Sequence, residues 1–341
     1  MANGGIRHFF PGSNTADGFV GYFEGLRRRA QRAVILKGGP GVGKSTLMAA
    51  VGARFEGRGE PVSYYHCSGD PDSLDAVFAP QSGFLVLDGT APHVVDPRLP
   101  GARDGILNLG VCLDEQQLAG QAAEIEALTA EISGCYAQAY RYLAAARACR
   151  ADASAVYEEA FAAEDRRRLT RELLSLLPEG ETGGETHLFA QAITCQGVLQ
   201  RVDSIWEDAA YCLDLPWGMD PTALLAPLLR AAENAGWARA VYHDPLDAAG
   251  VLHLTVGKGV FTTAVLMDAP VLRPKLNEAT LRRAGQRLAF DRAGWELLLN
   301  QAVEALAEAK QRHDALERFY IDAMDYGRLE EIKAAFLQTL L

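Results

Sequence analysis

The sequence contains an internal repeat, and this repeat restricts the possible folds more than any single motif does. Residues 36–84 align without a gap to residues 213–261. Both copies place a Tyr-His pair after an apolar segment, as Tyr65-His66 and as Tyr242-His243. Further matches are His8 with His187, Phe10 with Phe189, Ala146 with Ala309 and Tyr157 with Tyr320. A duplication of this extent predicts two similar folding units in tandem.

The two copies share one predicted order of elements. In the first copy, we expect a helix over 19–32, an apolar strand over 33–36 and a helix over 44–55. Further strands are expected over 62–67 and 84–87. Strands that alternate with helices are typical of an α/β fold with parallel sheets and crossover connections.

A long helical tail closes each copy. In the first copy, apolar residues recur at helical spacing after Leu118, and no proline interrupts the chain before Pro178. A straight helix of that length would measure ~90 Å, so we expect the chain to fold back near Asp152 or Ser154, which are good N-caps. The Gly- and Pro-containing stretch 178–185 is the expected linker.

The repeat and its linker divide the chain into two expected domains. Residues 1–178 form the first unit with its helical hairpin, and residues 187–341 form the second. A chain of 341 residues is long enough for two ordinary domains.

Residues 38–45 read Gly-Gly-Pro-Gly-Val-Gly-Lys-Ser and match the phosphate-binding pattern G-x-x-x-x-G-K-[ST], between a predicted strand and a predicted helix. Glycines let successive backbone N–H groups surround a phosphate, and the helix start adds its dipole. Lys44 is expected to reach the β- and γ-phosphates, and Ser45 to bind Mg²⁺. The expected nucleotide-binding residues are Gly38, Gly39, Pro40, Gly41, Val42, Gly43, Lys44, Ser45 and Thr46. The fold class is therefore expected to be α/β with tandem P-loop NTPase-like units, ATP and Mg²⁺ being the cofactors.

Asp88 ends the apolar segment 84–87 and is the candidate aspartate on the metal side. The alternative is an ordinary turn, Asp88-Gly89. Together with Lys44, Asp88 is a candidate catalytic residue.

The segment 66–75 follows a predicted strand and holds three aspartates. Ligands bind beyond the carboxyl ends of strands in open parallel sheets, so this segment is expected to face the phosphates. Asp70, Asp72 or Asp75 could then serve as a general base or could position a water, Asp70 being the catalytic candidate. The alternative is an Asx turn in which Asp72 or Ser73 caps a following helix.

The second copy lacks the phosphate-binding chemistry. Pro221 stands where the first copy has Lys44, and Asp220 stands where it has Gly43. A phosphate would meet a carboxylate and no cation, so we expect a non-binding structural unit and one ATP per chain. Arg230 or Arg239 is a candidate charge-stabilising group for the first site.

Composition limits the partners and the location. The formal net charge of -11 makes nucleic acid an unfavourable partner. The six cysteines form no CxxC pair, which indicates reduced thiols rather than a zinc site. No apolar run reaches the ~18 residues of a membrane span. We therefore expect a cytoplasmic protein with no membrane association.

The sequence resembles a family of bacterial tandem P-loop proteins regarded as ATPases or nucleotide kinases with no defined substrate. The resemblance covers nearly the whole chain and is carried by residues 36–46, 66–75, 88–93 and 309–320. In the last of these, the matching residues are Ala309-Lys310, His313-Asp314, Leu316-Glu317 and Tyr320. The resemblance implies a P-loop fold in both halves, and the altered second loop departs from it.

The leading expectation is a Mg²⁺-dependent ATPase with one nucleotide site. The alternatives are a kinase that transfers the γ-phosphate to a nucleotide or another small acceptor, and a non-catalytic, ATP-dependent module that binds a protein partner.

Overall fold

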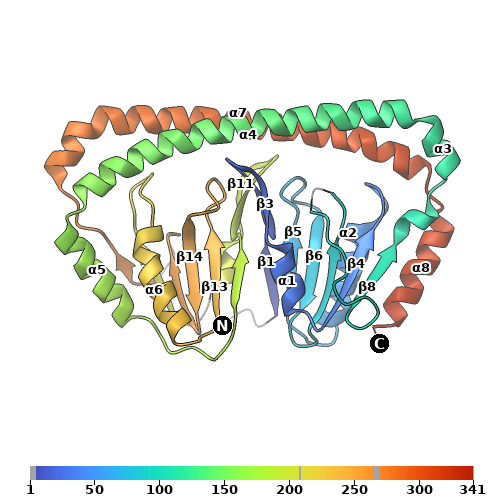
Figure 1. Ribbon diagram of the computed structural model, residues 1–341, viewed down its shortest axis with the longest axis horizontal. Helices are drawn as coiled ribbons and strands as arrows, with labels where there is room; N and C mark the ends of the chain where they lie inside the picture. The colour runs from blue at the N-terminus through green and yellow to red at the C-terminus, as the bar shows by residue number, and fades with distance from the viewer. Residues whose placement is uncertain (1–4, 92, 207–208, 265–268, 341) are drawn as a thin grey trace.

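The computed structural model describes residues 5–91, 93–206, 209–264 and 269–340, which form two α/β units beneath a pair of long helices (Figure 1). The first unit contains β1 (Ile6–Phe9), β2 (Gly12–Thr15), β3 (Gly18–Gly21), α1 (Phe23–Arg29), β4 (Arg32–Lys37), α2 (Lys44–Glu56), β5 (Val62–His66), β6 (Leu74–Ala79), β7 (Phe84–Asp88), β8 (Asp104–Asn108) and η1 (Leu109–Cys112). The second contains β9 (Glu185–Leu188), β10 (Gln191–Thr194), β11 (Gly197–Gln200), η2 (Val202–Ile205), β12 (Ala209–Leu213), α6 (Thr222–Asn234), β13 (Arg239–His243), β14 (Val251–Val256), β15 (Gly259–Thr262) and β16 (Val271–Leu272). The shared order of elements confirms the duplication.

Each unit is built on a six-stranded sheet of the described residues, with the order β1-β5-β6-β7-β4-β8 in the first and β9-β13-β14-β15-β12-β16 in the second. In the first sheet, β6 runs antiparallel to both of its neighbours, while the other pairs are parallel. The antiparallel strand β14 takes the same place in the second sheet. The expectation of purely parallel sheets is therefore wrong at this one strand.

Two local predictions fail because short strands follow tight turns. The expected helix over 19–32 is in fact β3 followed by the shorter α1, and β3 pairs with β2 in a hairpin. Asp72 and Ser73 do not cap a helix, because the chain turns directly into β6. An apolar six-residue strand that returns next to its predecessor leaves no room for a crossover helix.

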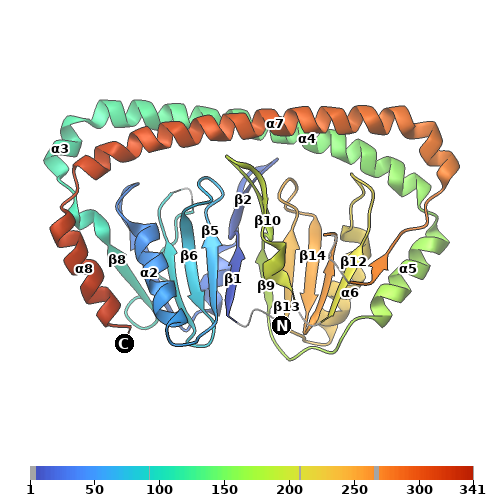
Figure 2. The ribbon, with the colours of Figure 1, turned by 180° about the vertical axis from the view of Figure 1, so that it is seen from behind.

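The two long helices α4 (Ala122–Ala160) and α7 (Glu278–Asp322) pack along each other and pass over both units (Figures 1 and 2). Small buried residues line their contact, among them Ala139 and Ala146 on α4 and Ala302 and Ala305 on α7. The expected fold-back near Asp152 or Ser154 is wrong, since α4 continues through both residues and ends at Ala160. The long partner helix α7 stabilises the straight course of α4, which the sequence of α4 alone could not indicate.

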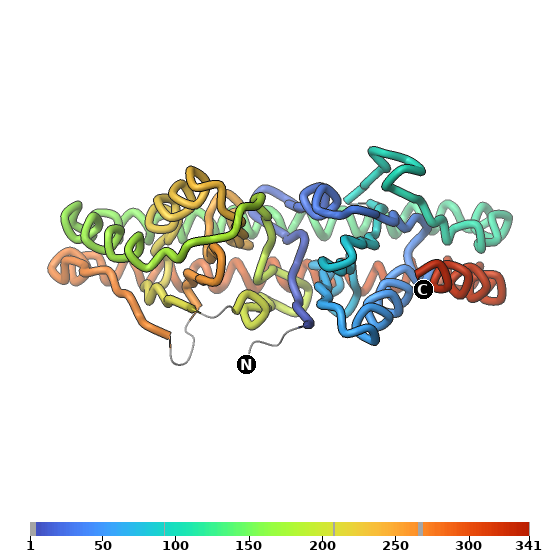
Figure 3. The backbone as a smooth tube through the Cα atoms, turned by 90° about the horizontal axis from the view of Figure 1, so that it is seen from below, coloured from blue at the N-terminus to red at the C-terminus, as the bar shows by residue number. Residues whose placement is uncertain are grey.

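The shorter helices at the ends of the tails pack on the opposite copy. Helix α5 (Ala163–Ser175) follows α4 and packs against α6, with Leu169 and Leu173 in the core of the second unit. Helix α8 (Tyr326–Gln338) follows α7 and places Leu329 in the core of the first unit. Seen from below, these helices lie at opposite ends of the molecule (Figure 3). The short helix α3 (Glu115–Gly120) precedes α4. Each helical tail therefore contributes core residues to the unit encoded by the other half of the chain.

The two units meet at the β1 and β9 edges. The backbone N–H groups of Phe10 and Phe189 each donate to the other's carbonyl at 3.0 Å, and both rings are fully buried. Among the helices of the described residues, none combines the length and apolar character needed to cross a bilayer.

Candidate functional site

The glycine-rich loop joins β4 to α2 at the carboxyl edge of the first sheet. Gly41 and Gly43 have φ angles of 70° and 81°, in the left-handed region that favours glycine. Gly43 directly precedes α2, and no side chain caps the start of that helix. The first N–H groups of α2 are therefore available to an anion.

The Lys44 side chain lies inside this loop. Its Nζ donates to the carbonyl oxygens of Gly39 at 2.7 Å and Gly38 at 3.3 Å, and it lies 3.6 Å from Oδ2 of Asp88. Lys44 is 9% exposed, so its charge is held in a sheltered position. The sequence-predicted residues Lys44 and Asp88 thus lie side by side.

Three further hydrogen bonds orient the predicted metal ligands. Ser45 Oγ accepts the N–H of Leu74 at 3.0 Å, which links the start of α2 to β6. Asp88 Oδ1 accepts from the backbone N–H and the hydroxyl of Thr90, at 2.8 and 2.6 Å. Asp88 Oδ2 lies 3.6 Å from the Lys44 ammonium. A hydroxyl at the start of α2 and a carboxylate at the end of β7 have the hard oxygen donors that Mg²⁺ prefers.

The three aspartates of the segment 66–75 have different surroundings. Asp70 accepts from the Ser73 hydroxyl at 3.0 Å and lies 3.5 Å from Lys310 of α7. Asp72 accepts from Gln196 of the second unit at 3.2 Å. Both carboxylates are thus engaged by groups outside the glycine loop.

Asp75 is buried on β6, within the electrostatic influence of Lys44 and Asp88. Burial, and next the negative charge of Asp88, raise the pKa of Asp75 to about 8. The Asp75 carboxylate lies 3.9 Å from Nε2 of His93, and burial lowers the pKa of that imidazole. His93 stacks on Phe23 with ring centroids 4.3 Å apart. Its neighbour Pro92, part of the resembling segment, lies outside the described residues.

The helical tail of the second half covers the glycine loop. A Cβ on Gly39 would lie 2.5 Å from the Tyr320 ring, and one on Gly41 would contact Ile321 and Glu317. A Cβ on Gly43 would lie 3.1 Å from Nζ of Lys333, which α8 positions. Of these residues, Glu317 and Tyr320 belong to the resembling segment 309–320, which was the available signal. Lys333 had none, because a tertiary contact brings it to the loop.

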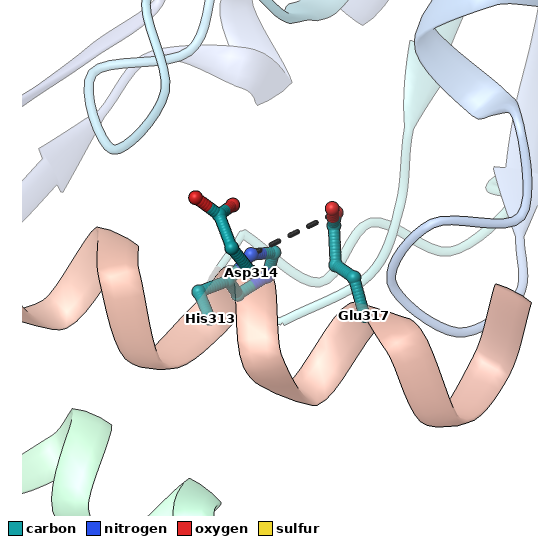
Figure 4. Close-up of side chains that lie close together, drawn as sticks. All are labelled: His313, Asp314 and Glu317. Carbon is teal, nitrogen blue, oxygen red and sulfur yellow. Dashed lines mark ion pairs between the residues drawn. The ribbon is translucent and has the colours of Figure 1, made fainter.

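Asp314 and Glu317 extend from α7 toward the loops of the first unit, with His313 beside them (Figure 4). Potential ligand atoms of the three residues lie within 4.8 Å of one another. The His313 imidazole is 3.7 Å from Glu317, and Lys310 pairs with Asp314. The Lys310 ammonium therefore already balances part of this acidic cluster.

The corresponding loop of the second unit has a different chemistry. Asp220 accepts the N–H of Thr222, the first residue of α6, at 2.9 Å, so a carboxylate of the chain occupies the helix start. Thr222 Oγ1 accepts the N–H of Val251 at 2.9 Å, just as Ser45 Oγ accepts the N–H of Leu74 in the first unit. The duplication therefore preserves the architecture of the site but not its free N–H groups.

The expectation of a second loop without any cation is wrong. Helix α4 places Arg147 and Arg150 at a cavity of about 690 Å³ beside this loop. Arg150 pairs with Asp244 at 2.6 Å, and Arg147 pairs with Asp17 at 2.5 Å. Both guanidinium groups are thus already neutralised by carboxylates.

The proposed role of Arg230 or Arg239 at the first site also fails. Arg239 pairs with Glu185 at 2.6 Å within the second sheet. Arg230 lies on α6, which packs on the second sheet and on α5, at the opposite end of the molecule from α2 (Figure 1).

Comparison with known proteins returned no match to a protein-family model, to a curated protein or to a solved structure.

Proposed function

We propose that the first unit binds Mg²⁺-ATP in the glycine loop and cleaves its γ-phosphate, and that the second unit carries no nucleotide. The supporting observation is a single arrangement: an uncapped helix start, two left-handed glycines, and Lys44 beside Asp88. Backbone N–H groups and the lysine would hold the phosphates, while Ser45 and Asp88 would hold the metal.

In this proposal, Lys44 holds the loop in shape before the nucleotide binds. Its ammonium bonds to two loop carbonyls and approaches Asp88, so a phosphate would replace those carbonyls as the partner. Mg²⁺ would then replace the Lys44 ammonium as the positively charged partner of Asp88. Binding of nucleotide and of metal is therefore expected to be mutually dependent.

Lys333 is proposed as a second cation for the bound phosphates. Two ammonium groups near one helix N-terminus repel each other and the helix dipole, and an anion between them would relieve that repulsion. Lys333 is 12% exposed and forms an ion pair with Glu330 at 3.0 Å. The second copy would thus supply a charge-stabilising group in place of Arg230 or Arg239.

Two carboxylates remain candidates for orienting the attacking water. Asp70 stays a prediction, with its carboxylate turned to Ser73 and Lys310. Asp75 is favoured by its burial near Lys44 and Asp88 and by its raised pKa. A bound metal would lower the pKa of Asp75 and make it a proton acceptor when the substrate is in place.

The test is ADP formation by the purified full chain with ATP, in the presence and in the absence of Mg²⁺. An ATPase turns over with water alone, and chelation of the metal should abolish turnover. Stoichiometric ATP binding with no ADP formation under any condition would instead favour a non-catalytic binding module.

A further inference from the structure

A second cavity lies beside α1, at the segment that follows β7. Its volume is about 370 Å³, near the lower end of the roughly 300–1,000 Å³ typical of small-ligand sites. Phe19 and Phe23 contribute aromatic rings, and the residues 93–96 close the other side. The cavity lies apart from the glycine loop and from the acidic cluster on α7.

His93 lines this cavity and has unused hydrogen-bonding capacity. Its side chain is only 7% exposed, and neither ring nitrogen has a hydrogen-bond partner among the described residues. A buried polar group without a partner costs free energy unless a ligand or water completes it. The same imidazole lies 3.9 Å from Asp75, whose charge environment includes Lys44 and Asp88. His93 therefore lies between the cavity and the proposed phosphate site.

The charges around the cavity argue against an anionic ligand. Its lining includes the carboxylates of Glu24 and Asp96 and no lysine or arginine. The nearby cations already have partners: Lys37 pairs with Asp96 at 3.0 Å, and Arg98 pairs with Glu24 at 3.1 Å. A phosphorylated ligand would thus find no uncommitted cation among the lining residues. A neutral molecule would need no cationic partner in the cavity, and its ring could stack on Phe19 or Phe23.

We propose that this cavity is the acceptor site of a phosphotransferase, and that the acceptor is an uncharged, ring-bearing compound with a hydroxyl group, of nucleoside size, rather than a nucleotide. This inference rests on the function proposed above. The acceptor oxygen forms a bond to the γ-phosphorus of ATP, the bond from that phosphorus to the β–γ bridging oxygen breaks, and ADP leaves with Mg²⁺. The hydroxyl proton passes to a ring nitrogen of neutral His93, the residue that contacts the acceptor.

The experiment uses the full chain with Mg²⁺-ATP and follows both ADP and the phosphorylated product. The probes are adenosine, guanosine, cytidine and uridine, and the comparison set is their 5′-monophosphates. At least one nucleoside should raise ADP formation over the rate in water alone, with a matching amount of nucleoside monophosphate formed. The monophosphates themselves should not stimulate.

Two variants connect the stimulation to the cavity. His93→Gln keeps a hydrogen-bonding side chain but cannot accept the proton, so the stimulated rate should fall by about 100-fold, with ATP affinity unchanged. Val94 lines the cavity and is 63% exposed, so Val94→Trp should obstruct the cavity and abolish stimulation while the chain stays folded. The matched control is Val198→Trp at a half-exposed position of β11, which should keep the full stimulation.

The outcomes separate this inference from the function on which it rests. If the chain binds no ATP, the proposed function itself is wrong. If it binds and hydrolyses ATP but no nucleoside stimulates it, or if only monophosphates do, the acceptor assignment is overturned. Stimulation that survives both His93→Gln and Val94→Trp would likewise show that the acceptor binds elsewhere.

Discussion

At the scale of single residues, Lys44 is the clearest case of a side chain whose role can be measured directly. We predict that Lys44→Ala weakens ATP binding by about 2 kcal/mol or more, about 30-fold, because a charge-assisted contact to phosphate is lost. Calorimetry on both proteins measures the difference. The control is Lys275→Ala at an exposed position of the second half, which should leave the affinity as it is. Equal affinities for wild type and Lys44→Ala would remove the glycine loop as the site.

A substitution of Asp88 should distinguish ATP binding from ATP hydrolysis. We predict that Asp88→Asn lowers Mg²⁺-dependent hydrolysis far more than it lowers ATP binding, because the metal mainly neutralises charge that develops in the transition state. ADP formation and calorimetric affinity are compared on the same preparation. Should the variant hydrolyse ATP like the wild type, Asp88 would be only a turn residue bonded to Thr90.

The raised pKa of Asp75 predicts that the free energy of unfolding depends on pH. The unfolded carboxyl titrates near its ordinary pKa of 3.8, while burial raises the pKa of the folded one to about 8. Between these values the unfolded chain releases a proton that the folded chain keeps, so the free energy of unfolding falls as pH rises. Asp75→Asn removes this penalty, and its melting temperature relative to wild type should increase from pH 5 to pH 8.

The melting temperatures of wild type and Asp75→Asn are compared at the same pH. The titration of groups common to both proteins, such as the buried His253, therefore cancels in the difference. Asp72→Asn serves as the control, since that carboxylate lies in the exposed loop and bonds to Gln196. A melting-temperature difference for Asp75→Asn that is the same at both pH values would contradict an uncharged, buried Asp75.

Residue-level prediction from sequence was strongest where a motif fixes local backbone geometry. The loop from Gly38 to Ser45 and the strand-ending Asp88 lie together because a strand, a tight turn and a helix are specified within a few residues. His93 belongs to the resembling segment 88–93 but had no predicted role, and Lys333 was missed altogether. Their neighbours come from α1, β6 and the far end of the chain. No local pattern encodes such contacts.

At the scale of elements, β4, α2, β5 and β7 match the expected segments closely, because periodicity and glycine turns determine them locally. Strand β6 was not expected, since the turn residues 68–73 conceal a strand that begins at Leu74. The straight course of α4 depends on α7, a helix more than a hundred residues later in the sequence. Elements whose partners are distant were thus the least predictable.

Helix α8 carries Lys333 to the glycine loop of the first unit. We predict that Lys333→Met weakens ATP binding by about tenfold, near 1.4 kcal/mol, because the apolar stem is kept while one phosphate contact is lost. Arg328→Met on the same helix removes an equal charge from a residue bonded to the Val111 carbonyl. If both variants weaken binding equally, the effect is a general one of charge and Lys333 has no specific role.

At the scale of the whole molecule, the exchange of helical tails makes the two halves interdependent. The glycine loop of the first unit is covered by Tyr320 and Lys333 of the second half, and the corresponding loop of the second unit is covered by Ala153 of the first half. A nucleotide that moves α7 at one loop would therefore act on α4, which packs along it. Retention of the second unit without its phosphate chemistry is consistent with this shared architecture.

We predict that each chain binds one ATP. Space alone does not exclude a second nucleotide, because the cavity beside the second loop measures about 690 Å³. The exclusion is chemical: Asp220 occupies the start of α6, Pro221 has no N–H to donate, and Arg147 and Arg150 already pair with aspartates. Calorimetry should give a stoichiometry near one for the wild type, and for Lys44→Ala only the weakened first site. A stoichiometry near two, or a site of unchanged affinity in the variant, would place a nucleotide at the second loop.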